Sequence, residues 1–333
     1  MKRALLATVL GCVMLHAAEV RVNEKAQIEA PGTDVRVFRG DAEKPLFGTL
    51  MRDGQGVRFA PALPFVPGED YRVEFQTKEG TWSTQRVRFE PLKAEAPAVS
   101  IAPSPTVLPA NALKVYLKFT QPMEQGVFLE RISLHRQDGR VVSGAFRETE
   151  LWSPDGRRLT LWLHPGRQKT GVNLNLDEGP VLREGEKHTL KIAAAWRSTA
   201  GIPLGNEASF VITAGAADHV RPDPARWRLT VPKAGAHQAL RVDFDEALDP
   251  AMLVAALNVH RGQTRLSGAV EVAADARTWL FTPSGTWLSG AYTLEIDPLL
   301  EDLAGNNLLH SFEVDLAHDK PASKPARLAF EVR

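Results

Sequence analysis

The feature that most constrains this chain is a pattern of strand residues that occurs three times. A separation of 125 positions joins the second and third copies: Val115 with Leu240, Leu117 with Val242, Phe119 with Phe244, Ile132 with Leu257, and Leu134 with Val259. A separation of 222 joins the first and third: Val37 with Val259, Gly40 with Gly262, Phe59 with Phe281, Pro61 with Pro283, and Gly68 with Gly290. Several matches at one separation indicate copies of one module, the first of them diverged.

Alternation of apolar and polar residues predicts that each copy is built of strands. Val115, Leu117 and Phe119 face one way, while lysines alternate with them, which is the pattern of a strand buried on one face. Glycine (25) and proline (23) are spread along the chain, as turns between many short strands require. We therefore predict an all-β chain of tandem antiparallel β-sandwiches.

The predicted organisation has five parts: a signal peptide at 1–18, a diverged β domain at 19–97, β-sandwiches at 98–217 and 218–318, and a C-terminal tail at 319–333. Proline-rich residues 94–109 and residues 218–224 are expected to be linkers. The tail ends in the alternating residues Leu328-Ala-Phe-Glu-Val332, which could form an edge strand.

Two stretches depart from the strand pattern. Residues 250–256 predict one short helix, because Asp249 can cap it and Pro250 suits its first turn. Residues 166–180 form a loop that is longer than a sandwich turn needs. This loop has no counterpart in the third copy, so it is one place where a specific function could lie.

The N-terminus predicts export. Lys2 and Arg3 precede an apolar stretch from Ala4 to Leu15 that is too short to span a bilayer, and small residues precede Glu19. Cys12, the only cysteine, lies in a stretch that faintly matches a lipoprotein cleavage box. Simple secretion to the periplasm, cell surface or medium is favoured over a lipid anchor on Cys12, because the residues after Cys12 are still apolar. A secreted mature chain then has no cysteine and no disulfide.

Composition excludes several classes of partner. The formal net charge is +0, which leaves no basic footprint for nucleic acid or an anionic membrane. Beyond the N-terminus, no segment approaches the roughly 20 apolar residues of a transmembrane helix. The histidines lack zinc-site spacing, and no Gly-x-Ser-x-Gly elbow or phosphate loop occurs, so we expect neither an enzyme nor a cofactor.

A resemblance to a known family adds to this interpretation. Leu117-Lys-Phe-Thr-Gln-Pro-Met123, Val242-Asp-Phe-Asp-Glu-Ala-Leu248 and Leu303-Ala-Gly-Asn306 resemble the opening strand and closing turn of bacterial Ig-like domains of the S-layer-protein type. Residues 111–316 are also similar to a family of uncharacterised secreted bacterial proteins. The resemblance implies Ig-like sandwiches used as spacers, adhesins or scaffolds, and it carries no catalytic residues across.

Polar residues near the closing turn raise two hypotheses. Tyr71 and Tyr292 follow a glycine at the start of a late strand, where a tyrosine of Ig-type sandwiches packs inward and bonds to backbone. His188 takes that place in the second copy and is expected to be packed there. Asp302, Asn306 and Asn307 offer oxygens to Ca²⁺, but the second copy lacks them, so a structural turn is favoured over a calcium site.

Other candidate residues have a structural explanation that is favoured over a functional one. The carboxylate pairs Asp243/Asp245 and Glu148/Glu150 could perform acid-base chemistry but are expected on a solvated strand face. Tryptophans could stack on sugar rings, although core packing is favoured. The candidates are Trp152 and Trp162, with Trp279 and Trp287 in the third copy.

We therefore expect an exported, non-enzymatic repeat protein that acts as a structural or adhesive spacer at the cell envelope. The alternative is a carbohydrate- or protein-binding module that uses the 166–180 loop with Trp162 and Trp152. In both cases the partner is an unknown protein or glycan of the envelope.

Overall fold

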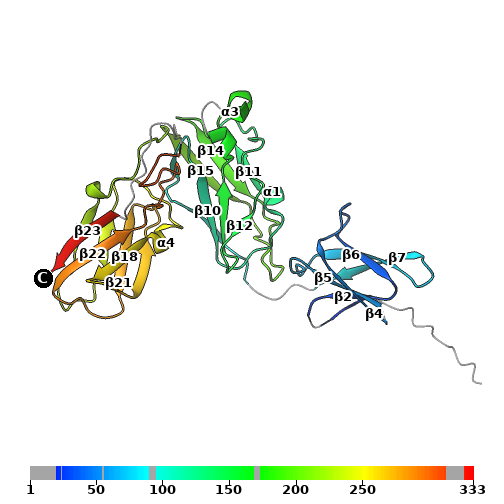
Figure 1. The fold of residues 1–333 in the computed structure, drawn as a ribbon. Coiled ribbons are helices and arrows are strands. Elements are labelled where there is room, and N and C mark those ends of the chain that lie inside the picture. Colours follow the sequence, from blue (N-terminus) through cyan, green and yellow to red (C-terminus); the bar gives the residue numbers. More distant parts are fainter. Residues whose placement is uncertain (1–19, 24, 55, 90–94, 169–172, 313–325) are drawn as a thin grey trace, which may run out of the picture. The chain divides into compact units, whose positions relative to one another are not determined.

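The computed structural model describes residues 20–23, 25–54, 56–89, 95–168, 173–312 and 326–333 (Figure 1). The predicted signal peptide with Cys12 and residues 313–325 lie outside this range. The chain divides into two compact units, residues 1–95 with 199–202, and residues 96–198 with 203–333. Among the described residues, no helix has the length and apolar character needed to cross a membrane.

The first unit is a sandwich of two antiparallel sheets. One sheet has the order β1-β2-β5-β4 and the other β3-β6-β7. The strands are β1 (Arg21–Val22), β2 (Ile28–Ala30), β3 (Asp34–Arg39), β4 (Gly48–Asp53), β5 (Gly56–Pro61), β6 (Asp70–Gln76) and β7 (Trp82–Arg88). Alternate residues of β5 and β6, such as Phe59 and Val73, point into one buried core.

The second unit contains two sandwiches, and the first of these, which we call the second sandwich, spans β8 to β15. Its sheets have the orders β12-β13-β10-β8 and β11-β14-β15-β9. The strands are β8 (Val99–Ala102), β9 (Val107–Pro109), β10 (Lys114–Phe119), β11 (Ile132–His135), β12 (Leu151–Trp152), β13 (Arg158–Trp162), β14 (Lys187–Ile192) and β15 (Ala208–Gly215). All pairings are antiparallel except that of β9 with β15, which is parallel.

The third sandwich spans β16 to β23, with sheets β16-β17-β21-β20 and β19-β18-β22-β23. Its strands are β16 (Arg228–Thr230), β17 (Leu240–Asp243), β18 (Leu257–Arg261), β19 (Thr264–Arg265), β20 (Gly268–Val272), β21 (Thr278–Pro283), β22 (Gly290–Ile296) and β23 (Ala326–Val332). The C-terminal strand β23, red in Figure 1, pairs along the whole of β22. The fold is thus all-β, in tandem Ig-like antiparallel sandwiches.

The sequence repeat corresponds to equal places in the sheets. Leu117 on β10 pairs with Leu159, and its match Val242 on β17 pairs with Trp279. Val37 on β3 pairs with β6, the strand that contains Tyr71. Its match Val259 on β18 pairs with β22, the strand that contains Tyr292. Residues that match in the sequence repeat therefore lie on equivalent strands and at equivalent core positions.

The linker prediction for residues 94–109 is wrong from residue 99 onward. Strand β8 pairs with β10 and strand β9 pairs with β15, so this stretch supplies an edge strand to both sheets of the second sandwich. Proline is tolerated at a sheet edge, because only one side of the strand needs backbone donors. The prolines that suggested a linker instead mark edge strands.

Helices are short. They are α1 (Phe128–Arg131), α2 (Pro165–Gln168), α3 (Asn173–Glu178), α4 (Leu253–Ala256) and the 3₁₀ turn η1 (Pro224–Arg226). The helix expected at 250–256 is confirmed only in part, because α4 covers Leu253–Ala256 and Met252, not Asp249, is its N-cap residue. The Asp249 carboxylate accepts hydrogen bonds from the N–H groups of Ala251 and Met252 in the turn before the helix. The 166–180 loop was not expected to be helical, yet α2 and α3 occupy most of its described part.

The inward tyrosines are confirmed. Tyr71 accepts a hydrogen bond from the N–H of Val66 at 2.8 Å, and Tyr292 donates to the carbonyl of Leu288 at 2.9 Å. His188, on β14, is fully buried at the matching place in the second sandwich.

Candidate site at the junction of the second and third sandwiches

The closing turn of the third sandwich, residues 302–306, packs against the second sandwich. Leu303 lies in the hydrophobic core of the second sandwich, among residues such as Leu108 and Leu163. The N–H of Leu113 donates to the Leu303 carbonyl at 2.9 Å. A turn that the sequence marked as a structural feature of one module therefore joins two modules.

Gly305 is needed at this turn for two reasons. Its φ of +84° lies in the left-handed region that side chains disfavour. A Cβ atom built on it would lie 2.3 Å from Cδ1 of Leu113, which is far closer than atoms can approach. Any other residue here would need both a disfavoured backbone conformation and a movement of the Leu113 side chain.

A buried ionic network joins the two sandwiches beside this turn. The ammonium group of Lys114, on β10, lies 2.9 Å from Asp249 and 2.7 Å from Glu301, both in the third sandwich. The Asp249 side chain is 2% exposed. Burial opposes the charged form of Lys114, but the two carboxylates outweigh it and raise the pKa of Lys114 overall.

Tyr116 completes the network. Its hydroxyl is within 2.8 and 2.6 Å of the two carboxylate oxygens of Asp249 and donates to that group. Burial and the Asp249 charge raise the pKa of Tyr116. Lys114, Tyr116, Asp249 and Glu301 are called the junction network below.

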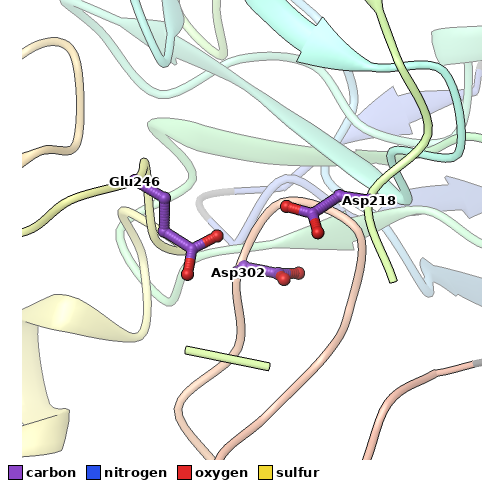
Figure 2. Close-up of side chains that lie close together, drawn as sticks. All are labelled: Asp218, Glu246 and Asp302. Carbon is purple, nitrogen blue, oxygen red and sulfur yellow. The ribbon is translucent and has the colours of Figure 1, made fainter. Parts of the chain in front are cut away.

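Three further carboxyl groups meet at the same junction. Asp218 comes from the connection between the sandwiches, Glu246 follows β17, and Asp302 opens the closing turn. Each offers an oxygen within 4.8 Å of the others, and Figure 2 shows the three groups pointing toward one another. Asp218 and Glu246 also line a hollow of about 340 Å³. We call Asp218, Glu246 and Asp302 the acidic cluster; it could hold one cation.

The acidic cluster holds protons at unusually high pH. Burial, then the nearby charges of Asp302 and Asp218, raises the pKa of Glu246 to about 8. Burial also raises the pKa of Asp302 to about 7, although hydrogen bonds from Asn306 oppose the shift. Like charges this close cannot all ionise without cost, so the cluster binds either protons or a cation.

The structure separates the three residues that were considered as calcium ligands, although a structural turn was favoured for them. Asp302 belongs to the acidic cluster, but the side-chain oxygen of Asn306 accepts from the N–H of Phe312 at 3.0 Å. The side-chain oxygen of Asn307 accepts from the N–H groups of Leu309 and His310. These two oxygens organise the turn. Sequence reasoning missed Asp218 and Glu246, because they are far from the turn along the chain and only the docking of the two sandwiches brings them close.

The predicted tryptophans take different places. Trp279 and Trp287 are buried in the third core. Trp152 is partly buried against the second core, with its ring centroid 5.8 Å from that of Phe119. Trp162 is half-buried next to the junction network, and the ammonium group of Lys114 lies 5.3 Å from its ring centroid.

The 166–180 loop is anchored to the second sandwich at the residues before and after its undescribed part. Arg167 is buried and donates to the backbone carbonyls of Ser143, Gly179 and Glu178. The Gln168 side chain donates to the carbonyl of Ala112 at 2.6 Å. Leu176 of α3, by contrast, is 70% exposed.

The candidate acid-base pair of the third sandwich is engaged in ion pairs. Asp243 receives two hydrogen bonds from Arg241, the first cause of its lowered pKa, and Asp245 lies 3.0 Å from Arg226. A carboxyl group with a lowered pKa is a poor proton donor at neutral pH. In the other pair, Glu150 accepts from the N–H of Gly126.

No protein-family model matches this chain, and no curated protein matches it in sequence. Several solved structures are similar at low scores. The N-terminal part of the bacterial S-layer protein SbsC is 13% identical with a TM-score of 0.27, over 61% of this chain and 41% of that one. Domains 4–9 of SbsC are 11% identical with a TM-score of 0.23, over 90% of this chain and 39% of that one. The FN1–FN3 domains of chicken CNTN1 are 12% identical with a TM-score of 0.21, over 95% and 98% of the two chains.

This chain thus spans about two fifths of the length of each SbsC structure. At these TM-scores the likeness assigns no function to this chain.

Proposed function

We propose that this protein is an exported, non-enzymatic spacer of the cell envelope, built of Ig-like sandwiches of the bacterial S-layer-protein type. The observation that carries the proposal is the junction network. Two charged pairs and a tyrosine hydroxyl hold the second and third sandwiches to one another, whereas a flexible tether would need no such contacts. A joint built in this way suits a protein that holds a fixed distance.

The rigidity of the joint can be measured directly. Spin labels on the exposed residues Val141 and Leu288 place one probe on each sandwich. A narrow distance distribution, broadened by Asp249→Ala, is the expected result. A broad distribution in the unmutated protein would overturn the spacer proposal.

Export is tested separately. Cell fractionation should place the protein outside the cytoplasm, and mass spectrometry should find a mature chain that begins at Glu19. A mature chain that begins at a lipid-modified Cys12 would replace simple secretion with a membrane anchor. Protein found only in the cytoplasm would remove the envelope role.

A binding module is the alternative proposal, and one observation favours it. Leu176 on α3 is 70% exposed within the loop that the third sandwich lacks, and an exposed apolar side chain in an inserted loop suits a contact with a partner. Binding to a glycan array or to envelope proteins that is lost in Leu176→Ser and Trp162→Ala supports this alternative. Equal binding by both variants and the parent protein excludes this surface.

A further inference from the structure

The three sandwiches share an arginine next to the inward residue of the late strand. Arg39 pairs with Tyr71 in the first sandwich. In the third, Arg261 follows the pair His260–Thr293, so it lies opposite Tyr292, and its guanidinium carbon is 5.9 Å from the Tyr292 ring.

The second sandwich differs at this place. The pair His135–Thr189 places the next residues, Arg136 and His188, opposite each other. We call this place, where an arginine lies opposite the inward residue of the late strand, the corner of each sandwich. The inward residue is tyrosine in two sandwiches and histidine in one.

The change from tyrosine to histidine leaves buried polar atoms unused. Tyr71 and Tyr292 both bond to backbone through their hydroxyls. His188 is fully buried, and neither ring nitrogen makes a hydrogen bond of good geometry among the described residues, although the backbone of Glu186 lies close enough to favour its protonated form. Nη1 of Arg136 is also buried without a hydrogen bond. Buried polar groups nearly always make hydrogen bonds, so the unused hydrogen-bonding groups here could serve a bound ligand.

A cavity adjoins the corner. It measures about 510 Å³, and its lining includes Arg136, Arg140 and Arg183 together with Asp138 and Glu186. A volume of this size accommodates a small molecule. Three guanidinium groups against two carboxylates leave an excess of one positive charge.

The carboxylates do not use up the arginines. Glu186 lies 3.9 Å from Arg136 and 3.8 Å from Arg183, which is too long for a hydrogen bond. Asp138 is paired with Arg140 at 2.7 Å. Arg167, close enough to repel Arg136 and Arg183, is itself paired with Glu178. The N–H groups of Arg136 and Arg183 are therefore the ones available to an incoming acceptor.

The charges agree with this geometry. Burial and the nearby Arg183 lower the pKa of Arg136, and burial and Arg136 lower the pKa of His188. Both groups would gain from a negative charge placed between them and the solvent.

We propose that the cavity of the second sandwich lined by Arg136 and Arg183, next to the buried His188, is a binding site for an oxyanion: a carboxylate, sulfate or phosphate group carried by a small ligand. Guanidinium groups match such anions through two parallel hydrogen bonds. The site is independent of the spacer proposal, because it uses no residue of the junction.

The test uses the full chain with labelled histidine. Sodium sulfate, sodium phosphate and glucuronate are titrated separately against sodium chloride at equal ionic strength, while the ring nitrogens of His188 are followed by NMR and binding by calorimetry. At least one oxyanion should saturate the His188 signals and raise the pKa of His188. Sulfate or phosphate alone would identify a tetrahedral ligand, and glucuronate alone a sugar acid.

Variants separate a built site from general attraction. Arg183→Gln should weaken binding about tenfold, which is the loss of one charged hydrogen bond. Glu186→Gln should tighten binding, because it removes a competing carboxylate. Arg265→Gln, at the position of the third sandwich that matches Arg140, should change nothing. Arg136 is mostly buried, so the exposed Arg183 carries the test. No saturable response to any oxyanion, or equal losses in Arg183→Gln and Arg265→Gln, overturns the proposal.

Discussion

The hydroxyl of Tyr116 in the second sandwich donates to the carboxylate of Asp249 in the third, at 2.6 Å from its nearer oxygen. Asp249 also caps the N–H groups of Ala251 and Met252 and pairs with Lys114. One carboxylate thus holds together a loop of its own sandwich and a strand of the neighbouring one. Its removal should loosen both.

Replacement of Asp249 should destabilise the second unit strongly. Asp249→Ala leaves the ammonium group of Lys114 with Glu301 alone and the Tyr116 hydroxyl without its acceptor. Breaking a buried pair costs about 3–5 kcal/mol of unfolding free energy. Urea unfolding of the full chain measures this loss.

A double-mutant cycle tests the direct contact. Tyr116→Phe and Asp249→Asn should show a coupling energy of about 1 kcal/mol or more. The ion pair of Asp243 with Arg241 is the control. This pair is more exposed, so a cycle that removes its two partners should give a coupling energy of less than about 1 kcal/mol. Additive losses in the cycle would show that the two side chains do not cooperate.

Gly305→Ala should lower the free energy of unfolding more than a glycine-to-alanine substitution whose only effect is on the backbone conformation. Left-handed backbone costs about 1–2 kcal/mol for alanine, and the overlap with Leu113 adds about 1–3 kcal/mol. Gly235→Ala is the matched control, since Gly235 has a φ of +75° in open space in the same sandwich. Equal losses in the two variants would mean that the closing turn does not press against Leu113. Thermal unfolding compares them.

Stability should fall as the pH rises through neutrality. The ordinary pKa of 4.5 for glutamate becomes about 8 for Glu246, and 3.8 becomes about 7 for Asp302. Between these values the folded chain holds protons that the unfolded chain has lost, so the unfolding free energy decreases with increasing pH. Glu246→Gln stays neutral at every pH, so its curve should be flatter and its stability at pH 8 higher. Glu271→Gln, exposed on β20, is the control and should follow the parent curve.

Calcium can be tested on the same proteins. A cation in the acidic cluster would replace the protons, so calcium would raise the melting temperature at pH 8 in the parent chain and much less in Glu246→Gln. If neither calcium nor a chelator changes the melting temperature, the acidic cluster does not bind calcium. In that case the cluster is a proton-linked contact between the sandwiches.

Arg167→Met should release the 166–180 loop. The substitution keeps most of the apolar stem but removes the part-buried hydrogen bonds from a charged donor to the carbonyls of Ser143, Glu178 and Gly179, each of them worth about 1.5–3 kcal/mol. Limited proteolysis should then cut within 166–180 faster than in the parent. Arg147→Met, at an exposed site, should leave the cleavage rate unchanged. Unchanged cleavage in Arg167→Met would show that other contacts hold the loop.

Several parts of the fold follow from local pattern. The matches of Val115 with Leu240 and of Val37 with Val259 identified equivalent strands, because a strand buried on one face needs apolar residues at every second position. Tyr71, Tyr292 and His188 were expected to be inward because each follows the start of a late strand, where Ig-type sandwiches have an inward tyrosine. Prolines misled the prediction at residues 94–109, since edge strands and linkers both tolerate proline and only pairing with β10 and β15 distinguishes them.

The sequence by itself determined the kind of module, its repetition and its core positions, because these depend on residues close together in the chain. Only the tertiary structure decided what the polar residues do. Lys114 and Asp249 lie 135 positions apart, and Asp218 and Asp302 lie 84 apart, so no local pattern joins them. Their meeting depends on how one sandwich docks on the next through Leu303 and Gly305. The energy of a buried charge is set by its partners in space, and those partners come from a different module.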